Sequence, residues 1–116
     1  MTQDYIGTKQ VQAWEQQKES ADGYGVKYQD GYISWSPKDV FESAYLALGH
    51  VGDKPPHVQR MIGEKAQLDD RLAKLQKFIA SPAFQEQSSK SRELLTTQAG
   101  AMAEYSELLQ VRLDLA

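Results

Sequence analysis

The sequence contains no cysteine, which excludes disulfide bonds, thiolate zinc sites and cysteine nucleophiles. Its two histidines, His50 and His57, flank a proline pair and belong to no HExxH, GxSxG, GxGxxG or Walker motif. The first residues, MTQDYIGTK, lack an apolar run of the length that a signal peptide or a membrane span requires. We therefore expect a cytoplasmic protein that is not an enzyme, with no catalytic residues, no metal ligands and no cofactor.

The composition is that of a folded protein without a strong charge. Of 116 residues, 41% are hydrophobic and 25% are charged, which is too apolar for a wholly disordered chain. With 13 Lys and Arg against 16 Asp and Glu, the net charge of -3 gives no general attraction to a DNA or RNA polymer or to a membrane. Any anionic ligand must therefore be bound by a local cluster of cations.

The N-terminal third has the alternation of β-structure. An Asp-Gly pair at Asp30-Gly31 between two alternating runs favours a two-residue type I′ turn, which pairs Gln29 with Tyr32. The polar segment 16–25 is typical of a mobile surface loop. We expect strands over 5–11, 26–29 and 32–35, with Val26, Tyr28, Ile33 and Trp35 on one apolar face.

A short helix is predicted after the last strand. Ser36 can cap it, Pro37 suits its first position, and Asp39 adds a carboxylate to its first turn. Apolar residues then recur at helical spacing and end before Gly49, so the helix should cover the sheet. The sequence predicts a small sheet and helix module over 1–51, a linker at 52–56, and a helical hairpin over 57–116.

After the linker the apolar period becomes helical. The break between the two helices is expected at Ala80-Ser81-Pro82, because proline cannot continue the first helix and serine can cap the next. The predicted seam positions are Val58, Met61, Lys65, Leu68, Leu72, Leu75 and Ile79 in the first helix, and Leu95, Gln98, Met102, Tyr105, Leu109, Arg112 and Ala116 in the second.

Several apolar residues fall outside that seam and predict self-association. A two-helix hairpin can bury one stripe of each helix, and the remaining apolar surface then needs a partner. These residues are Leu94, Ala101, Leu108, Leu113 and Leu115. The fold class predicted is α+β: a small N-terminal three-stranded antiparallel sheet with one short helix, followed by a long antiparallel helical hairpin in a homo-oligomer.

Polar residues within the predicted seams are the candidates for ligand binding. Lys65 and Arg112 can extend their head groups to solvent, and Gln98 can fix the register of the helices. Alternatively these cations, with Arg60 and Arg71 nearby, form a pocket for a small polyanion. Both interpretations are open.

Two aromatic residues are also candidates either for ligand binding or for a structural role. The Tyr105 hydroxyl needs a partner within a seam, and Phe84 follows the predicted turn, where an exposed ring could stack on a purine. Either ring could instead belong to the core. The neighbouring carboxylates Asp69 and Asp70 point in different directions on a helix, so they are more typical of a solvated surface than of an acid-base pair.

Three segments carry a family resemblance that covers nearly the whole chain. They are YIGTK at Tyr5, DGYISWSPKDVFESAY from Asp30, and HVQRMIGEKAQLDDRLAKLQKFI from His57 with the run from Phe84 to Arg112. Together they resemble the phage Thoeris anti-defence sponges, whose helical hairpin is similar to that of the anti-CBASS sponges. The second segment is widespread in phage genomes, and the hairpin makes the match more specific.

The resemblance implies a phage protein that acts in the cytoplasm of the bacterial host. Such a sponge binds glycocyclic ADP-ribose signals without cleaving them, which inhibits Thoeris defence. Some members also bind cyclic di- or trinucleotides, and the family forms dimers or hexamers. The resemblance places binding residues at Arg60, Phe84 and Arg112, to which our residue analysis adds Lys65 and Tyr105.

The sequence departs from the anti-CBASS pattern at the cyclic-dinucleotide site. Where those sponges have an aromatic hydroxyl, a lysine and a threonine, this chain has Lys65, Ala80 and Pro82. We therefore favour glycocyclic ADP-ribose over cyclic dinucleotides. The alternative function is a protein-protein adaptor that docks its hairpin on a host factor; a nuclease or phosphodiesterase is disfavoured because the sequence has no cluster of metal ligands.

Overall fold

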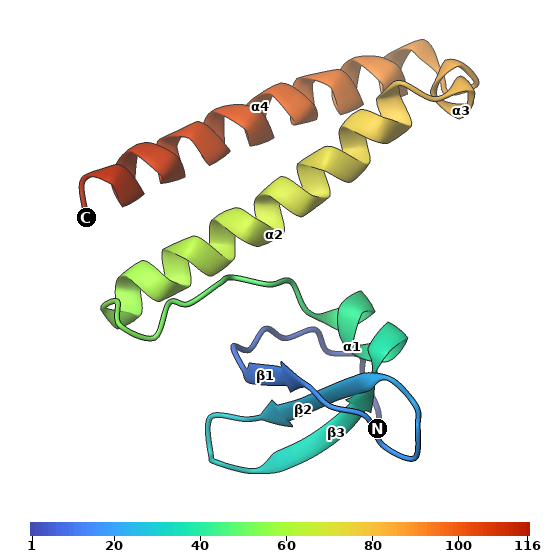
Figure 1. Ribbon diagram of the computed structural model, residues 1–116. Coiled ribbons are helices and arrows are strands. Elements are labelled where there is room, and N and C mark those ends of the chain that lie inside the picture. Colours follow the sequence, from blue (N-terminus) through green and yellow to red (C-terminus); the bar gives the residue numbers. More distant parts are fainter. The chain divides into compact units, whose positions relative to one another are not determined.

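A computed structural model describes residues 1–116 as two compact units, 1–46 and 47–116. The first unit holds a three-stranded sheet and a short helix, and the second holds the long helices (Figure 1). The predicted α+β class is confirmed. The elements are β1 (Gln12–Glu15), β2 (Gly23–Lys27), β3 (Ile33–Pro37), α1 (Lys38–Ala44), α2 (Pro56–Ile79), α3 (Pro82–Gln85) and α4 (Ser89–Asp114).

The first strand does not lie where the sequence predicted it. Residues 5–11 belong to no strand, and β1 begins at Gln12. The polar segment 16–25 was wrongly interpreted as a loop, because its second part is the central strand β2. Lys18 and Ala21 exchange two backbone hydrogen bonds of 2.9 Å, and Glu19 (φ 51°) and Ser20 (φ 69°) form the tight turn between β1 and β2. Neither turn residue is glycine or asparagine, so no sequence signal marks this hairpin.

The hairpin between β2 and β3 has a three-residue loop, and the two-residue turn predicted at Asp30-Gly31 is wrong. Tyr28 N–H donates to the Tyr32 carbonyl at 2.9 Å, and only Gly31 has a positive φ (91°) in this loop. The Asp30 carboxylate accepts a hydrogen bond from Tyr32 N–H at 3.0 Å, which stabilises the longer loop. The register therefore shifts by one residue, which changes the face on which the β3 side chains lie.

One face of the sheet is covered by α1. Lys27 pairs with Ile33 and Val26 with Ser34, so Val26 and Trp35 lie on opposite faces and the predicted single apolar face is wrong. Val26 is 1% exposed, and on its face the Tyr24 ring stacks on Phe41 at 4.4 Å between ring centroids. This packing gives the unit its small core.

The other face carries both tryptophans. Trp14 and Trp35 lie opposite Gly25 on the neighbouring strands, and a Cβ on Gly25 would collide with the Trp14 ring. Both indole N–H groups donate to Gln16: Trp14 Nε1 to its side-chain Oε1 at 2.9 Å and Trp35 Nε1 to its carbonyl at 2.8 Å. Gly25 is therefore needed because the indole occupies the position of a side chain.

The short helix differs in detail from its prediction. Pro37 occupies the N-cap position, and no side chain caps the helix, so Ser36 does not have the predicted role. The helix ends at Ala44, where Tyr45 is already extended, rather than just before Gly49. The Ser36 hydroxyl contacts the Pro37 carbonyl instead of a free N–H group.

The second unit is the predicted antiparallel hairpin of α2 and α4. With 24 residues, α2 is about 36 Å long. It ends at Ile79, Pro82 begins α3, and the Ser88 hydroxyl caps α4 by accepting a hydrogen bond from Ser91 N–H at 3.1 Å. The predicted break is confirmed, but the predicted capping by Ser81 is wrong, because its hydroxyl donates to the Phe78 carbonyl at 2.6 Å and caps no helix. None of the helices has both the length and the apolarity that crossing a membrane requires.

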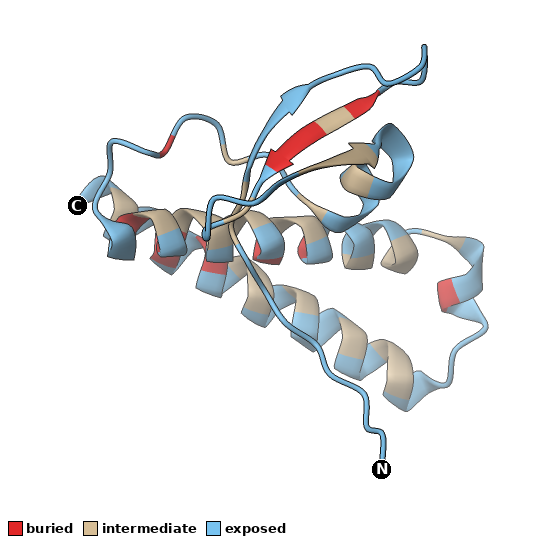
Figure 2. Ribbon diagram, turned by 90° about the horizontal axis from the view of Figure 1, so that it is seen from below, coloured by how far each residue is buried: buried red, intermediate tan, exposed pale blue.

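The seam between α2 and α4 agrees with the prediction in α2 and differs from it in α4. The α2 positions are confirmed: Val58, Met61, Leu68 and Leu72 are buried and Lys65, Leu75 and Ile79 are half-buried (Figure 2). In α4 the seam consists of Leu95, Ala99, Met102, Ser106, Leu109 and Leu113. Gln98, Tyr105, Arg112 and Ala116 are exposed, so their predicted seam positions are wrong, as is the placement of Leu113 outside the seam.

Candidate functional site

A polar layer crosses the middle of the hairpin. Lys65 Nζ lies 2.7 Å from Asp69 Oδ2, and the Ser106 hydroxyl of α4 donates to the other oxygen, Asp69 Oδ1. Lys65 and then Ser106 hold the pKa of the Asp69 carboxyl below its ordinary value, because both stabilise its charged form. The half-buried Lys65 therefore pairs with Asp69 within α2, and the hydrogen bond from Ser106 to Asp69 joins α4 to α2.

Sequence reasoning missed Asp69 and Ser106 as members of this layer. Asp69 resembles a surface carboxylate, and Ser106 resembles any small polar residue of a long helix. The available signal was the four-residue spacing of Lys65 and Asp69, together with the place of Ser106 between Met102 and Leu109 at helical spacing.

The open end of the hairpin carries two arginines. Arg60 lies in the first turns of α2 and Arg112 in the last turn of α4, which the antiparallel arrangement brings to the same end (Figure 1). Both are exposed, and neither guanidinium takes part in an ion pair. The α2 N-terminus brings the positive end of its helix dipole to this end of the hairpin, and the α4 C-terminus brings the negative end of its own. The two unpaired guanidiniums are therefore the groups at this end that suit an anion.

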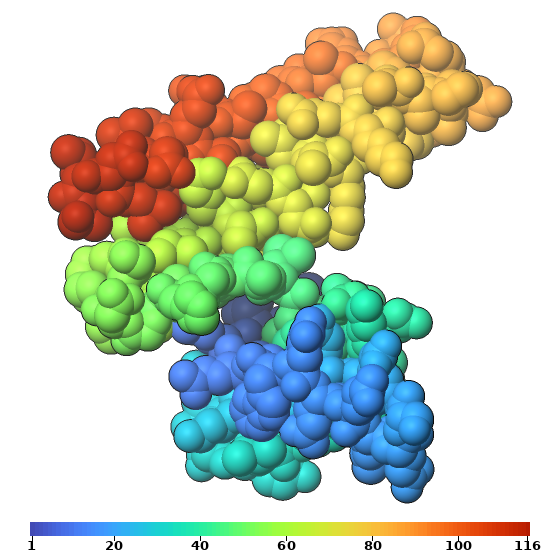
Figure 3. Space-filling model, in the orientation of Figure 1, coloured from blue at the N-terminus to red at the C-terminus, as the bar shows by residue number.

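Phe84 lies at the opposite, closed end. Its side chain is 7% exposed and meets Phe78 edge to face, with ring centroids 6.1 Å apart (Figure 3 shows this end in yellow and light orange). The expectation of an exposed Phe84 ring is therefore wrong, because the ring closes the turn between the helices. Arg92 Nη1 also donates to the Gln85 carbonyl at 3.2 Å and stabilises the same turn.

The five predicted binding residues do not converge in one chain. Arg60, Lys65 and Arg112 lie in the half of the hairpin near its open end. Tyr105 is 43% exposed on α4. The 19 residues from Arg60 to Ile79 place the closed end, and with it Phe84, about 28 Å away. A small ligand that contacts Arg60 therefore cannot contact Phe84 of the same chain.

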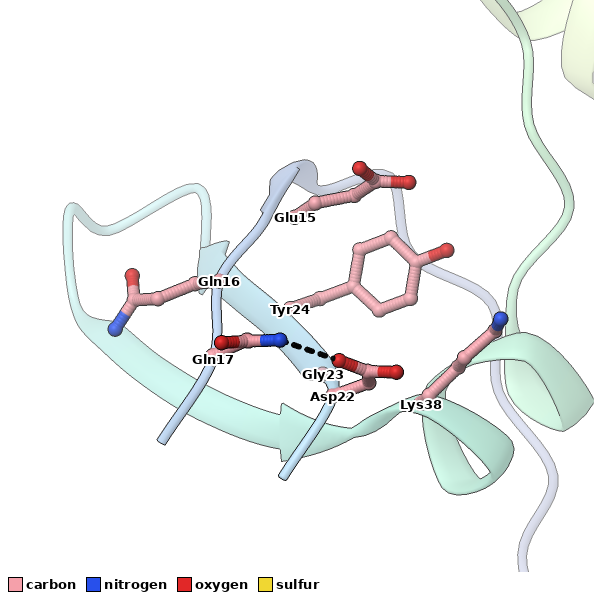
Figure 4. Close-up of a pocket in the computed structure, with 7 residues that line it drawn as sticks. All are labelled: Glu15, Gln16, Gln17, Asp22, Gly23, Tyr24 and Lys38. Atoms are coloured by element: carbon pink, nitrogen blue, oxygen red, sulfur yellow. Dashed lines mark hydrogen bonds between the residues drawn. The ribbon is translucent and has the colours of Figure 1, made fainter. Parts of the chain in front are cut away.

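The first unit has two shallow hollows. One of about 210 Å³ lies beside β2 and is lined by Glu15, Gln16, Gln17, Asp22, Gly23, Tyr24 and Lys38 (Figure 4). Gln17 Nε2 donates to Asp22 Oδ1 at 2.9 Å, and the carboxylates of Glu15 and Asp22 outnumber the single ammonium of Lys38. Hydrogen bonding to the Glu42 carboxylate raises the pKa of the Tyr24 hydroxyl, which keeps it protonated. This hollow does not suit a phosphate.

The other hollow lies at the β2–β3 loop and has a volume of about 540 Å³. Tyr28 and Tyr32 stack at 6.0 Å there, and Lys9 Nζ lies 4.5 Å from the centroid of the Tyr28 ring. The lysine is thus already engaged with an aromatic face. Nowhere in the chain do three His, Asp or Glu side chains come close enough to hold a metal ion.

The fold and these features define an α+β protein whose C-terminal unit is a helical hairpin with exposed cations at its open end. A family model described as Sequestin matches residues 55–115, which include α2, α3 and α4. The chain belongs to the Sequestin family, whose name indicates a sequestering protein. No curated protein and no solved structure matches the chain. The sheet unit lies outside the matched residues.

Proposed function

We propose that the protein sequesters glycocyclic ADP-ribose, binding the signal without cleaving it, and so inhibits Thoeris defence. The match to the Sequestin family over the hairpin carries this proposal. The resemblance of the sequence to phage Thoeris anti-defence sponges supplies the ligand. Cyclic di- or trinucleotides are further ligands that we propose on the same resemblance.

The electrostatics of the hairpin support an anionic ligand. Arg60 and Arg112 are exposed and have no carboxylate partner, so a diphosphate could bind them without breaking an ion pair. Arginine presents its donors in a planar fork that matches phosphate oxygens. Lys65 adds positive charge but is held by Asp69, so we expect it to contribute less.

A sponge must compete with the effector that reads the signal. An affinity of about 1 nM corresponds to about -12 kcal/mol. Charge-assisted hydrogen bonds contribute about 1.5 to 3 kcal/mol each, so several are needed together with stacking of the adenine. The separation of Arg60 from Phe84 means that one chain does not supply all of these groups, which supports a homo-oligomer, either dimer or hexamer.

We further propose that the protein is phage-encoded and acts in the cytoplasm of the bacterial host, where the signal is made. It would bind no DNA or RNA polymer and no membrane. The adaptor function is the second candidate, favoured by the exposed apolar residues of α4: Leu94, Leu108, Val111 and Leu115.

Titration calorimetry against a panel of cyclic nucleotides tests the proposal. We expect tight binding of glycocyclic ADP-ribose, weaker or no binding of cyclic dinucleotides, and a stoichiometry that gives the number of sites. A protein that binds no nucleotide, yet retains one specific protein from host lysate, is an adaptor instead. Metal-dependent turnover of the ligand would indicate an enzyme.

A further inference from the structure

The side of the sheet opposite α1 carries aromatic and basic residues and no acidic ones. Side chains alternate between the two sides of a strand, so Gly23, Gly25 and Lys27 of β2 share this side. The residues paired with them in β1 and β3 lie there too, and they include Trp14 and Trp35. None of these paired residues is Asp or Glu. We call this side of the sheet the tryptophan face.

Each indole ring lies over a glycine of the central strand. A Cβ on Gly25 would collide with the Trp14 ring, and a Cβ on Gly23 would collide with the Trp35 ring. The inner side of the Trp14 ring is therefore covered, and its 41% exposure belongs to the outer side and the edges. Over Trp35, by contrast, Lys18 Nζ lies 5.5 Å from the ring centroid. Trp14 is thus the open aromatic ring of this face.

The polar edges of both indoles are already occupied. Trp14 Nε1 donates to the Gln16 side chain, and Trp35 Nε1 donates to the Gln16 carbonyl. A ligand therefore gains no hydrogen bond from either ring, and Trp14 offers it the flat surface of the indole. Every nucleobase has a π-face that stacks on such a surface. The two fused rings of the indole match the two fused rings of a purine in extent.

The lysines of this face are free to meet an anion. Lys27 is exposed, and neither Lys27 nor Lys18 takes part in an ion pair. Glu19, the acidic neighbour of Lys18 in the turn, takes part in none either. Lys27 lies two residues after Gly25 on the same side of β2, about 7 Å along the strand. Its long, flexible side chain therefore reaches a phosphate attached to a base that lies on Trp14.

We propose that the tryptophan face binds a purine nucleotide, with the base stacked on Trp14 and the phosphate bound by Lys27. This site lies outside the residues that match the Sequestin family, and it does not rest on the proposed function. It gives the sheet unit a binding role of its own. Because the face offers one open ring and one free lysine, we expect weaker binding than a sequestering site needs.

A single nucleotide suits this face better than a nucleic-acid strand. A second base would need the outer side of the Trp35 ring, where the Lys18 ammonium already lies. The first unit as a whole holds more carboxylates than lysines, so its field repels a long polyanion. The tryptophan face, which has no carboxylate among its paired strand residues, accepts one phosphate group.

A proline-rich peptide suits the face less well. Such peptides bind in grooves lined by aromatic side chains, and their backbone carbonyls have no internal hydrogen bonds and need donors. Here both rings lie on the sheet surface over glycines, and both indole N–H groups donate to Gln16. The face therefore presents a flat surface without free ring donors.

Tryptophan fluorescence of the full chain tests the proposal, because both tryptophans of the chain lie on this face. Adenosine monophosphate should quench the fluorescence with a saturating dependence on its concentration, since adenine stacks on Trp14. Adenosine, which lacks the phosphate, should bind about 5-fold more weakly or worse. Inorganic phosphate alone should leave the fluorescence unchanged.

Two lysine variants separate the face from the overall charge of the unit. Lys27→Gln should weaken the binding of adenosine monophosphate about 5-fold and leave adenosine binding unchanged. Lys38→Gln removes the same charge from α1, on the other side of the sheet, and should change neither. Trp14→Leu should weaken both ligands about 10-fold or more in equilibrium dialysis. If circular dichroism shows that Trp14→Leu does not fold, the two lysine variants decide the outcome.

Failure of adenosine monophosphate to quench would overturn the proposal. So would equal affinities for adenosine monophosphate and adenosine, or equal losses in Lys27→Gln and Lys38→Gln. An adenine oligonucleotide that binds more tightly per nucleotide than adenosine monophosphate would show a strand-binding surface instead, and a proline-rich peptide that quenches where the nucleotide does not would show a peptide site.

These outcomes are separate from the failure of the proposed function. If calorimetry finds tight binding of glycocyclic ADP-ribose while adenosine monophosphate leaves the tryptophans unquenched, the sequestering proposal stands and the nucleotide site on the tryptophan face does not. If adenosine monophosphate quenches as expected while no tight binding of glycocyclic ADP-ribose is found, the reverse holds.

Discussion

Asp69→Asn should destabilise the hairpin more than the matched substitution Asp70→Asn. Each aspartate pairs with a lysine four residues away in α2. Lys65 lies 2.7 Å from Asp69, and Lys74 lies 2.9 Å from Asp70. The difference is the hydroxyl of Ser106, which donates to Asp69 from the facing helix. Asp69 therefore connects two helices, whereas Asp70 pairs only within α2.

The structure gives the expected magnitudes. A hydrogen bond to a charged group contributes about 1.5 to 3 kcal/mol, and the Asp69 side chain is 43% exposed, so solvent screening reduces the loss to about 1 to 2 kcal/mol. The Asp70–Lys74 pair, whose lysine is 76% exposed, should contribute about 0.5 kcal/mol or less. Asparagine and aspartate have similar helix propensities, so the change in helix propensity adds little to the loss of stability in either variant.

Denaturant unfolding followed by far-ultraviolet circular dichroism measures this difference, because α2 and α4 supply most of the helix. A double-mutant cycle with Ser106→Ala isolates the coupling between the helices. The folded pKa of Asp69 is lowered, so its stabilisation is present above the unfolded pKa and is lost as the pH falls through the folded value. The native chain and Asp69→Asn should therefore converge in acid.

Equal losses for Asp69→Asn and Asp70→Asn at neutral pH would refute this reasoning. So would a coupling of zero between Asp69 and Ser106, since the layer would then not bridge the helices. A difference that persists undiminished at low pH would show that it does not come from the ionised carboxylate.

Three further predictions concern the core, the sheet and the ligand. Leu109→Ala, at a side chain that is 1% exposed, should cost about 3 to 4 kcal/mol in denaturant unfolding; a loss under about 1 kcal/mol would contradict the α4 seam. Gly25→Ala should destabilise the first unit by about 1 to 3 kcal/mol in tryptophan fluorescence, because its Cβ collides with Trp14; Gly7→Ala, with open space around it, is the control. Arg112→Ala should weaken nucleotide binding by more than about 1.5 kcal/mol in calorimetry, and unchanged affinity would remove Arg112 from the site.

Strong local signals allowed most of the hairpin to be predicted from the sequence. The α2 seam followed from a continuous three-four spacing, and the break followed from Pro82, which cannot continue a helix. In α4 the same reasoning was ambiguous, because Leu95, Met102 and Leu109 belong to two overlapping patterns. Pairing them with Gln98, Tyr105 and Arg112 or with Ala99, Ser106 and Leu113 gives the same spacing, and only contacts with α2 decide between them.

The sheet register could not be predicted, because it depends on side chains that interact at a distance in the sequence. Asp30 accepts from Tyr32 N–H and favours the longer loop, which shifts β3 by one residue. The hairpin at Glu19 and Ser20 has no glycine to mark it, and β2 contains two glycines that normally weaken a strand. The rings of Trp14 and Trp35 occupy the space where side chains at Gly25 and Gly23 would lie, and this is evident only when the pairing of the strands is known.

The sequence predicted the arginines of the candidate site, but it did not predict where the Phe84 ring lies. Exposed arginines at the ends of α2 and α4 follow from the sequence once the hairpin is antiparallel. The burial of Phe84 does not, because it depends on the contact that the Phe84 ring makes with Phe78 across the turn. Whether Arg60, Lys65, Phe84, Tyr105 and Arg112 contact a ligand stays a prediction.

Native mass spectrometry of the full chain with excess glycocyclic ADP-ribose, followed by release of the ligand on heating, tests the central claim most directly. Our account predicts an assembly that gains the mass of the whole ligand and releases it unchanged. An assembly that stays unliganded, or that releases a hydrolysed product, would contradict it.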